Sequence, residues 1–306
     1  MSWLSVVIPT FNSKSSLPAV IAALGSQQLV PGWQYELVIS DDGSTDQTLA
    51  TIPATLPPPW QLTVITHAHT GGAAARNRGI QAARGSVILL LGGDIILRPG
   101  AIRAHVDFHA SQSTTTAAAL GFVQWDPRLR PSPFMEWMTH GGQQNNYDKL
   151  LGKRTASPEH FLYGSHVSLK KELLLQYPFS DRFRHYGWED LDLGRRLVSA
   201  KVQLTVLHEA RGLHAHYYSV PAILRRQQHV GRGILTYQAL HPTSTAVRPL
   251  TRGRQIKVVL AQWSGAAVLL KWIVGWTGER WATPRLFAWV TVLSFWQGVY
   301  LGRGKQ

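Results

Sequence analysis

A single acid, Asp94, follows two glycines in the stretch "VILLLGGDIILRPG". The five apolar residues before the glycines are typical of a buried strand, so the carboxylate is expected just past the strand's carboxyl end. One carboxylate is a weak metal site alone, but Mg2+ and Mn2+ need few protein ligands when a diphosphate supplies other oxygens. Gly92 and Gly93 would let such a ligand approach the backbone closely. The alternative is a tight turn that carries an incidental aspartate.

A second group of acids lies in "HYGWEDLDLGRRL", where Glu189, Asp190 and Asp192 stand at an expected helix start. Acids in a first turn interact favourably with the helix dipole, which is the structural explanation. The functional explanation is a general base, a carboxylate aimed at an acceptor hydroxyl. Trp188 and Tyr186 could then stack on a sugar or on an apolar acceptor.

Histidines follow a predicted strand in "HEARGLHAHYY". A lone histidine is usually structural, but His214 and His216 lie two residues apart. In an extended segment that spacing places both side chains on one face. One of them could therefore complete the coordination begun by Asp94.

Two more motifs could hold an anionic nucleotide. Asp41, Asp42 and Asp46 follow a predicted strand, where ligands bind in doubly wound sheets, and a carboxylate there can accept from a nucleobase imide or a ribose hydroxyl. Ordinary turn and capping chemistry explains the same residues equally well. In "GGAAARNRGI", two glycines precede a helix whose N-terminus, with Arg76 and Arg78, could face an anion.

Continuous apolar runs separated by helical patterns predict the scaffold for these residues. Such runs indicate a parallel sheet covered by helices on both faces. Strands are predicted at Leu4–Pro9, Tyr35–Ser40, Gln61–Thr66, Ser86–Leu91, Ala117–Trp125, Gly164–Lys170 and Val202–Leu207. Helices are predicted at Lys14–Gln28, Gly71–Arg84, Gly187–Ala200 and Val220–Leu240, and "STDQTLATI" begins like a capped helix.

Composition narrows the class of protein. The 306 residues, 44% of them hydrophobic, suit one large domain or one domain with an extension. The absence of cysteine excludes disulfides and thiolate metal sites. The first residues, "MSWLSVVIPTF", are typical of a strand and not of a signal peptide, so the expected location is cytoplasmic.

Positive charge is concentrated in the last third of the chain. Of 31 Lys and Arg residues and 17 Asp and Glu residues, 16 basic and 2 acidic residues follow residue 194. This predicts an anionic partner: phospholipid, nucleic acid or a phosphorylated substrate. Two apolar stretches lie there, Val258–Leu270 and Leu286–Leu301, both near or below the ~20 residues of a spanning helix. These two stretches could form helices that pack together or on the main domain, a helical hairpin on a membrane surface, or a segment that spans the membrane.

Taken in order, the motifs resemble those of one family. "SVVIPTFN", "SDDGSTD", "GGAAARNRGI", "LLLGGDIILRPG", "YGWEDLDLGRRL" and "GLHAHYY" are similar, as a series over about residues 3–218, to the inverting family 2 glycosyltransferases with the GT-A fold. The resemblance implies an α/β, Rossmann-like mixed sheet with helices on both faces. It places the GT-A domain at 1–220, with a donor half at 1–110 and an acceptor half at 111–220. A basic helical extension, with membrane association as an open alternative, follows at 221–306.

The resemblance also implies a donor site. Family members transfer a sugar from a UDP-, GDP- or dTDP-linked donor to an acceptor hydroxyl, with inversion at the anomeric carbon. Pro9, Phe11 and Asp42 match positions that members use around the base and ribose, and Arg76 matches the basic helix near the donor. Gly93 is expected to make room for the diphosphate.

Metal and catalytic roles follow from the same resemblance. Asp94 matches the last acid of the DxD motif, which holds Mn2+ or Mg2+ on the diphosphate. His214 matches a histidine that binds the metal in some members. Asp190 matches the acid of the ED motif, the catalytic base, and Glu189 stands beside it.

One departure from the family pattern concerns Gly92 and Gly93, which occupy positions where acids are usual. Metal binding could rest on Asp94, His214 and the diphosphate, which leaves an active enzyme. Alternatively the site is weakened, which leaves a donor-binding, membrane-associated protein without catalysis. The intact "WED" favours activity.

The expected partners are a nucleotide-sugar and a glycan or lipid-linked acceptor, with an anionic membrane surface as a further candidate. Cell-envelope polysaccharide or glycolipid synthesis is the expected setting, with the protein cytoplasmic or peripheral at the inner membrane face. The rival hypothesis is a nucleic-acid-binding protein that uses the basic tail. The tail's charges flank tryptophan-rich apolar runs and match no nucleic-acid module, so no nucleic-acid partner is predicted.

Overall fold

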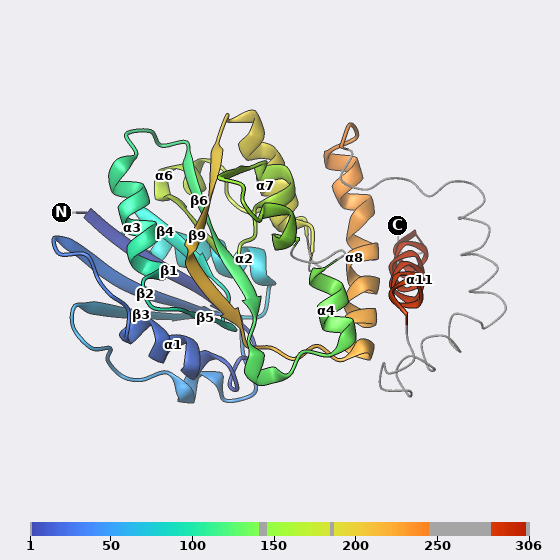
Figure 1. Cartoon of the computed structure of the whole chain (residues 1–306), viewed down its shortest axis with the longest axis horizontal. Coiled ribbons are helices and arrows are strands. Elements are labelled where there is room, and N and C mark those ends of the chain that lie inside the picture. The colour runs from blue at the N-terminus through green and yellow to red at the C-terminus, as the bar shows by residue number, and fades with distance from the viewer. Residues whose placement is uncertain (1, 141–145, 184–186, 245–282, 304–306) are drawn as a thin grey trace. The chain divides into compact units, whose positions relative to one another are not determined.

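The computed structural model describes residues 2–140, 146–183, 187–244 and 283–303 (Figure 1). The chain divides into two compact units. The first comprises residues 1–129, 149–181 and 189–216, and the second comprises residues 130–148, 182–188 and 217–306. The segments 130–148 and 182–188, which the sequence assigned to the acceptor half, thus join the C-terminal helices.

Four parallel strands form one half of the first unit's sheet. Their order is β3-β2-β1-β4. The strands are β1 (Ser2–Thr10), β2 (Trp33–Asp41), β3 (Trp60–Thr66) and β4 (Val87–Leu91). The apolar runs in β1, β2 and β4 are buried, as sandwiching between helix layers requires. The predicted parallel sheet is confirmed in this half.

The other half of the sheet is mixed. β8 (His166–Lys170) lies antiparallel between β4 and β6 (Ala117–Trp125), and β9 (Gln203–His214) runs parallel to β6. The short strand β5 (Ile95–Leu97) pairs antiparallel with β9, with Ile95 opposite His214. β9 therefore extends past the predicted end at Leu207. A two-residue strand, β7 (Thr155–Ala156), also pairs with β9.

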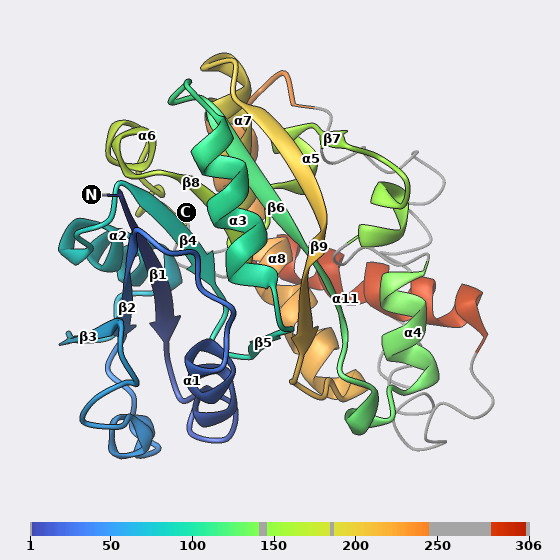
Figure 2. The same cartoon turned by 60° about the vertical axis from the view of Figure 1, so that its left-hand side comes forward.

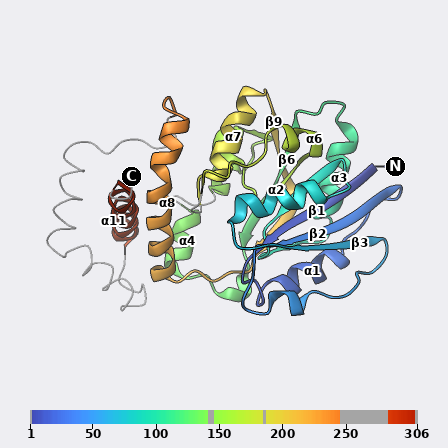
Figure 3. The ribbon, with the colours of Figure 1, turned by 180° about the vertical axis from the view of Figure 1, so that it is seen from behind.

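Helices cover both faces of this sheet. α1 (Leu17–Gly25) and α3 (Ala101–Ser111) lie on one face, whereas α2 (Gly72–Ala82) and α6 (Lys171–Gln176) lie on the other (Figures 1 and 3). The remaining short elements are α5 (Pro158–Phe161), α7 (Glu189–Ser199), η1 (Thr48–Thr51), η2 (Pro127–Leu129) and η3 (Tyr147–Leu150). "STDQTLATI" forms only the single 3-10 turn η1 and not a longer helix, and the Asp46 carboxylate accepts the Thr48 amide at its start.

Helices form the described part of the second unit. α4 (Pro133–Thr139), α8 (Val220–Leu240) and α11 (Pro284–Arg303) share an apolar core. Backbones of α8 and α11 approach closely at two glycines: a Cβ at Gly231 would overlap the Phe295 carbonyl, and one at Gly298 would overlap the Gln228 carbonyl. The stretch Leu286–Leu301 is therefore part of a packed helix pair.

The length and hydropathy of the helices decide whether any of them could cross a membrane. None of the helices within the described ranges combines the length and the apolar character needed to cross a bilayer. The other apolar stretch, Val258–Leu270, lies outside the described residues.

A polar cluster sits inside the first unit, between α3 and the sheet. His105, His109, His166 and Ser168 are each at most 2% exposed. Nε2 of His105 lies 3.2 Å from Nε2 of His166, and Ser168 Oγ lies 2.8 Å from both His105 Nδ1 and His109 Nε2. Burial lowers the pKa of His109 and of His166 from 6.5 to about 3, and burial with the neighbouring histidines lowers the pKa of His105 well below 6.5. The cluster is therefore neutral in the folded protein.

This cluster predicts acid-sensitive stability. The unfolded chain binds protons at these histidines near pH 6.5, whereas in the folded chain the pKa of His109 and of His166 is about 3 and that of His105 is well below 6.5. The free energy of unfolding should therefore fall as the pH drops through that window, by up to about 1.4 kcal/mol per pH unit for each histidine. Urea unfolding between pH 4 and 7 measures this. His109→Gln should reduce the slope, and His160→Gln, at an exposed site, should leave it unchanged. Equal slopes for wild type and His109→Gln would contradict the assignment.

Candidate active site

The turn after β4 brings the predicted pair Asp94 and His214 together. The Gly92 amide donates to the Ser165 carbonyl (2.9 Å), and the Asp94 carbonyl accepts from the Ala215 amide (2.8 Å). Between these anchors, His214 Nε2 lies 3.0 Å from Asp94 Oδ2. The pairing of β5 with β9 thus closes a contact between residues 120 positions apart in the sequence.

The surroundings of this pair keep the acid charged. The His214 ring stacks on Trp125, with centroids 4.9 Å apart, and its side chain is only 8% exposed, whereas that of Asp94 is 29% exposed. Burial raises the pKa of Asp94, but the charges of His214 and His216 and the hydrogen bond from His214 together lower it below its ordinary value. The carboxylate is therefore ionised at neutral pH, as a metal ligand must be.

The donor set at this turn suits a cation that takes most of its ligands from a substrate. Among the described residues, no group of three or more His, Cys, Asp and Glu side chains could enclose a metal ion. Asp94 offers a carboxylate oxygen, and His214 would offer an imidazole nitrogen once Nε2 gives up its hydrogen bond to Asp94; Mn2+ accepts both ligand types. A diphosphate would have to supply the rest.

The two glycines before Asp94 differ in the space around them. A Cβ at Gly92 would lie 2.9 Å from Asp94 Oδ1, so a side chain there would displace the carboxylate. A Cβ at Gly93 would meet nothing nearer than 3.5 Å, the Ser13 hydroxyl. Gly92 therefore protects the position of Asp94, whereas Gly93 leaves room at the turn.

The predicted base, Asp190, lies in the first turn of α7. Its Oδ2 accepts from the Gly164 amide at 3.0 Å. A Cβ at Gly164 would lie 2.6 Å from Asp190 Oδ1 and 3.2 Å from Arg76 Nε, so these two side chains converge on one glycine. Arg76 also pairs with Glu189 (3.4 Å) and lies over the Phe179 ring. The helix start thus gathers two acids and one guanidinium.

Two adjacent residues, Gly164 and Ser165, connect the turn that carries Asp94 to the first turn of α7, which carries Asp190. Gly164 donates its amide to Asp190, and Ser165 accepts the amide of Gly92. Asp94 and Asp190 are far apart in sequence. Hydrogen bonds with the backbone of one dipeptide just before β8 nevertheless hold the Asp190 carboxylate and the turn that carries Asp94. This arrangement places the predicted metal ligand and the predicted base around a common point.

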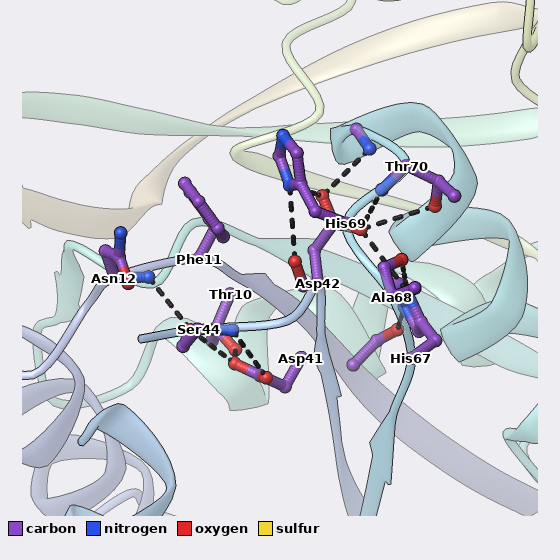
Figure 4. A network of polar contacts seen from close by, with 12 residues as sticks. Thr10, Phe11, Asn12, Asp41, Asp42, Ser44, His67, Ala68, His69 and Thr70 are labelled. Atoms are coloured by element: carbon purple, nitrogen blue, oxygen red, sulfur yellow. Dashed lines mark hydrogen bonds and ion pairs between the residues drawn. The ribbon is translucent and has the colours of Figure 1, made fainter. Parts of the chain in front are cut away.

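Asp42 holds the loop before α2 (Figure 4). Its Oδ1 accepts from the Thr70 amide and its Oδ2 from the Gly71 amide, both at 2.8 Å. The His69 Nδ1 lies 2.8 Å from Oδ2, and the Asp42 side chain is 3% exposed. This carboxylate orders the glycine-rich helix start, whereas Asp41 serves turn chemistry through the Ser44 amide.

Two histidines in this loop were missed by the sequence prediction. His67 Nδ1 lies 2.7 Å from an Arg78 NH1, and the same guanidinium donates to the Thr70 hydroxyl. His69 stacks on Phe11, with centroids 4.3 Å apart and planes at 28°. The signal was present in "THAHT", directly before the glycines, where polar rings follow the carboxyl end of a parallel strand.

The remaining predicted residues fall in different places. Pro9 is half-buried at the end of β1, and Phe11 is 45% exposed just beyond it. Trp188 belongs to the second unit, is 5% exposed, donates its indole N–H to the Val230 carbonyl (2.6 Å) and packs on Tyr237. Trp188 is thus a core side chain, which corrects its interpretation as an exposed stacking surface. Tyr186 lies outside the described residues.

Comparison of the sequence with models of known protein families identifies the family of this chain. The family model "Glycosyl transferase family 2" matches residues 5–177, more than half of the chain. The chain belongs to glycosyl transferase family 2. The resemblance seen in the order of the motifs is confirmed.

Two curated relatives of similar sequence are glycosyltransferases by name. A validoxylamine A glucosyltransferase of Streptomyces hygroscopicus subsp. limoneus is 25% identical over 235 residues, 69% of this chain and 51% of that protein. A PGL/p-HBAD biosynthesis glycosyltransferase of Mycobacterium bovis is 31% identical over 167 residues, 52% of this chain and 58% of that protein. The chain thus spans little more than half the length of these relatives.

Solved structures show the same fold. Residues 1–349 of S. aureus TarS superpose with a TM-score of 0.54 at 17% identity, covering 100% of this chain and 92% of that one. The mannosyltransferase PcManGT from Pyrobaculum calidifontis, solved with GDP-Man and Mn2+, gives 0.58 at 16% identity, covering 99% and 87%. The GT-A fold predicted for this family 2 member is confirmed.

Gly164 should tolerate no side chain. In Gly164→Ala the new methyl group would push Asp190 off the Gly164 amide, leaving a buried donor without its acceptor. We expect a loss of about 1–3 kcal/mol in the free energy of unfolding. Gly93→Ala, where the Cβ meets only ordinary contacts, is the matched control. Thermal unfolding compares the two, and equal melting temperatures would show that Asp190 is not held as described.

Proposed function

We propose that the chain is an inverting glycosyltransferase that moves a sugar from a nucleotide-diphosphate sugar to an acceptor hydroxyl. The observation that carries the proposal is the Gly164–Ser165 dipeptide, which positions Asp190 and the Asp94 turn together. Family membership supports it. So do the solved relatives of the fold, among them TarS in complex with UDP-GlcNAc and PcManGT with GDP-Man.

Asp94 and His214 would hold Mn2+ or Mg2+ on the donor diphosphate. The cation would neutralise negative charge on the departing nucleoside diphosphate. The proposal is supported by the ionised, partly exposed Asp94, by its contact with His214, and by the Mn2+ in the PcManGT structure.

Asp190 acts as the general base. It removes the proton from the acceptor hydroxyl while that oxygen bonds to the anomeric carbon and the bond to the diphosphate breaks. Attack from the opposite side inverts the anomeric centre, and no covalent intermediate with the protein forms. The Gly164 amide stabilises the charged carboxylate, and Arg76, paired with Glu189, keeps the helix start in place.

Donor contacts are assigned to the ends of the parallel strands. Pro9 and Phe11 border the base, and Gly93 leaves space for the diphosphate. Asp42 supports this site by ordering the loop at Thr70 and Gly71, whose helix start faces the anion.

A peripheral membrane location, and hence a lipid-linked or cell-envelope glycan acceptor, fits the second unit. One face of α11 packs against α8, and another exposes Trp289 (41%), Tyr300 (42%) and Leu301 (46%). Arg285 on α11 and Arg225 on α8 are also exposed. Aromatic rings with flanking cations are typical of helices that lie in an anionic membrane interface.

A catalytically degenerate, donor-binding protein is the second candidate. The observation in its favour is the loss of carboxylates at Gly92 and Gly93. Its distinguishing property is donor binding without turnover.

The first prediction separates binding from chemistry. Asp190→Asn should lower transfer by about 10²–10⁴-fold, because the amide cannot take the proton, while donor affinity stays at the wild-type value. A panel of UDP-, GDP- and dTDP-sugars, with and without Mn2+, measures both quantities. Asp107→Asn, at an exposed position, is the control.

Asp94→Ala in the same panel tests the cation. It should abolish the Mn2+-dependent part of donor binding. Wild-type turnover in Asp190→Asn would refute the base assignment. Binding without turnover in the wild type would favour the degenerate alternative, and no binding of any donor would remove both candidates.

The membrane assignment predicts binding to anionic vesicles. The chain should float with phosphatidylglycerol-containing vesicles and not with pure phosphatidylcholine vesicles. Trp289→Ser should weaken this several-fold, because its ring would lose apolar burial. Leu175→Ser, an exposed apolar site in the first unit, is the control. Flotation that is identical for all three proteins would contradict a role for α11.

A further inference from the structure

His69 has a defined hydrogen-bonding state. Its Nδ1 lies 2.8 Å from Asp42 Oδ2 and 3.2 Å from the Asp42 carbonyl oxygen (Figure 4). A carboxylate and a carbonyl can only accept, so Nδ1 carries the hydrogen. In the neutral ring, Nε2 is then a hydrogen-bond acceptor.

Asp42 itself has little capacity left for a ligand. Its two oxygens accept from the Thr70 and Gly71 amides and from His69, and its side chain is 3% exposed. A nucleobase could use this carboxylate only by breaking the loop's hydrogen bonds. The 59% exposed ring of His69 instead presents an acceptor outside the loop.

The neighbouring histidine is arranged differently. His67 Nδ1 lies 2.7 Å from Arg78 NH1, 3.1 Å from the Ala68 carbonyl oxygen and 3.3 Å from Asp42 Oδ1, and its Nε2 lies 3.3 Å from the Ser40 hydroxyl. The His67 side chain is 12% exposed. Both nitrogens of His67 thus have protein partners, whereas His69 Nε2 makes no hydrogen bond among the described residues.

Phe11 adds a stacking surface beside this acceptor. The Phe11 and His69 centroids are 4.3 Å apart, more than the roughly 3.5 Å of rings in full face contact, so the rings are offset. Phe11 is 45% exposed, which leaves part of its ring uncovered. A base lying beside the imidazole could therefore cover Phe11 with its face and meet Nε2 with its edge.

We infer that His69, oriented by Asp42, reads the base edge of the donor and selects bases that carry a ring N–H. Uracil, thymine and guanine offer such a donor, whereas cytosine and adenine present an acceptor at the equivalent nitrogen. His69 is thus a specificity-determining residue. The inference rests on the proposed function, because it assumes that a nucleotide binds at these strand ends.

Calorimetric binding of two matched nucleotide pairs, UDP with CDP and GDP with ADP, tests the inference. The full chain should prefer the N–H-bearing member of the pair it binds. His69→Phe keeps a ring against Phe11 but removes the acceptor. The substitution should lower the affinity for the nucleotide with the ring N–H about tenfold, because that N–H loses its acceptor. The affinity for the nucleotide without the ring N–H should stay unchanged. His160→Phe, an exposed histidine on α5, should behave as wild type.

The outcomes separate the two proposals. If His69→Phe keeps the wild-type preference, or if the wild type binds both members equally, His69 does not read the base and the proposed function stands. If none of the four nucleotides binds to the wild type, the proposed function fails and the inference fails with it. Only a preference that His69→Phe abolishes supports the assignment.

Discussion

Two consecutive backbone groups, the Gly164 amide and the Ser165 carbonyl, hold the candidate active site together. One bonds to the Asp190 carboxylate and the other to the turn that carries Asp94. Backbone groups have no rotamers, so the position of β8 sets where both acids lie. The pairing of β5 with β9 then brings His214 to Asp94. Glycine at 164 is a condition for this arrangement, because a side chain would take the space of the Asp190 oxygen.

Charge balance at the site follows from the same framework. The Asp94 carboxylate is partly buried, yet two histidines keep it ionised. Glu189 is buried at the start of α7, and Arg76 lies across from it. Each buried acid thus has a cationic neighbour or a backbone donor, which lowers the free-energy cost of keeping it charged in the absence of substrate.

Much of the fold was predictable because it depends on local patterns. The apolar runs of β1, β2 and β4 identified the parallel strands, and the order of the motifs identified the family. β5 was missed, since a strand of only three residues has too few positions to show a periodicity. The contacts of Asp42 were also beyond sequence analysis. An aspartate after a strand looks the same whether it faces a ligand or a loop, and only the tertiary path of residues 69–71 decides between them.

The space around Gly93 has an evolutionary consequence. Gly92 excludes a side chain, because any Cβ there would displace Asp94, but the fold imposes no such limit one residue later. A glycine codon of the form GGU or GGC becomes an aspartate codon by a single base substitution. The backbone at position 93 thus leaves room for the Cβ of a second acid, so steric exclusion at the Cβ does not explain the glycine there as it does at position 92.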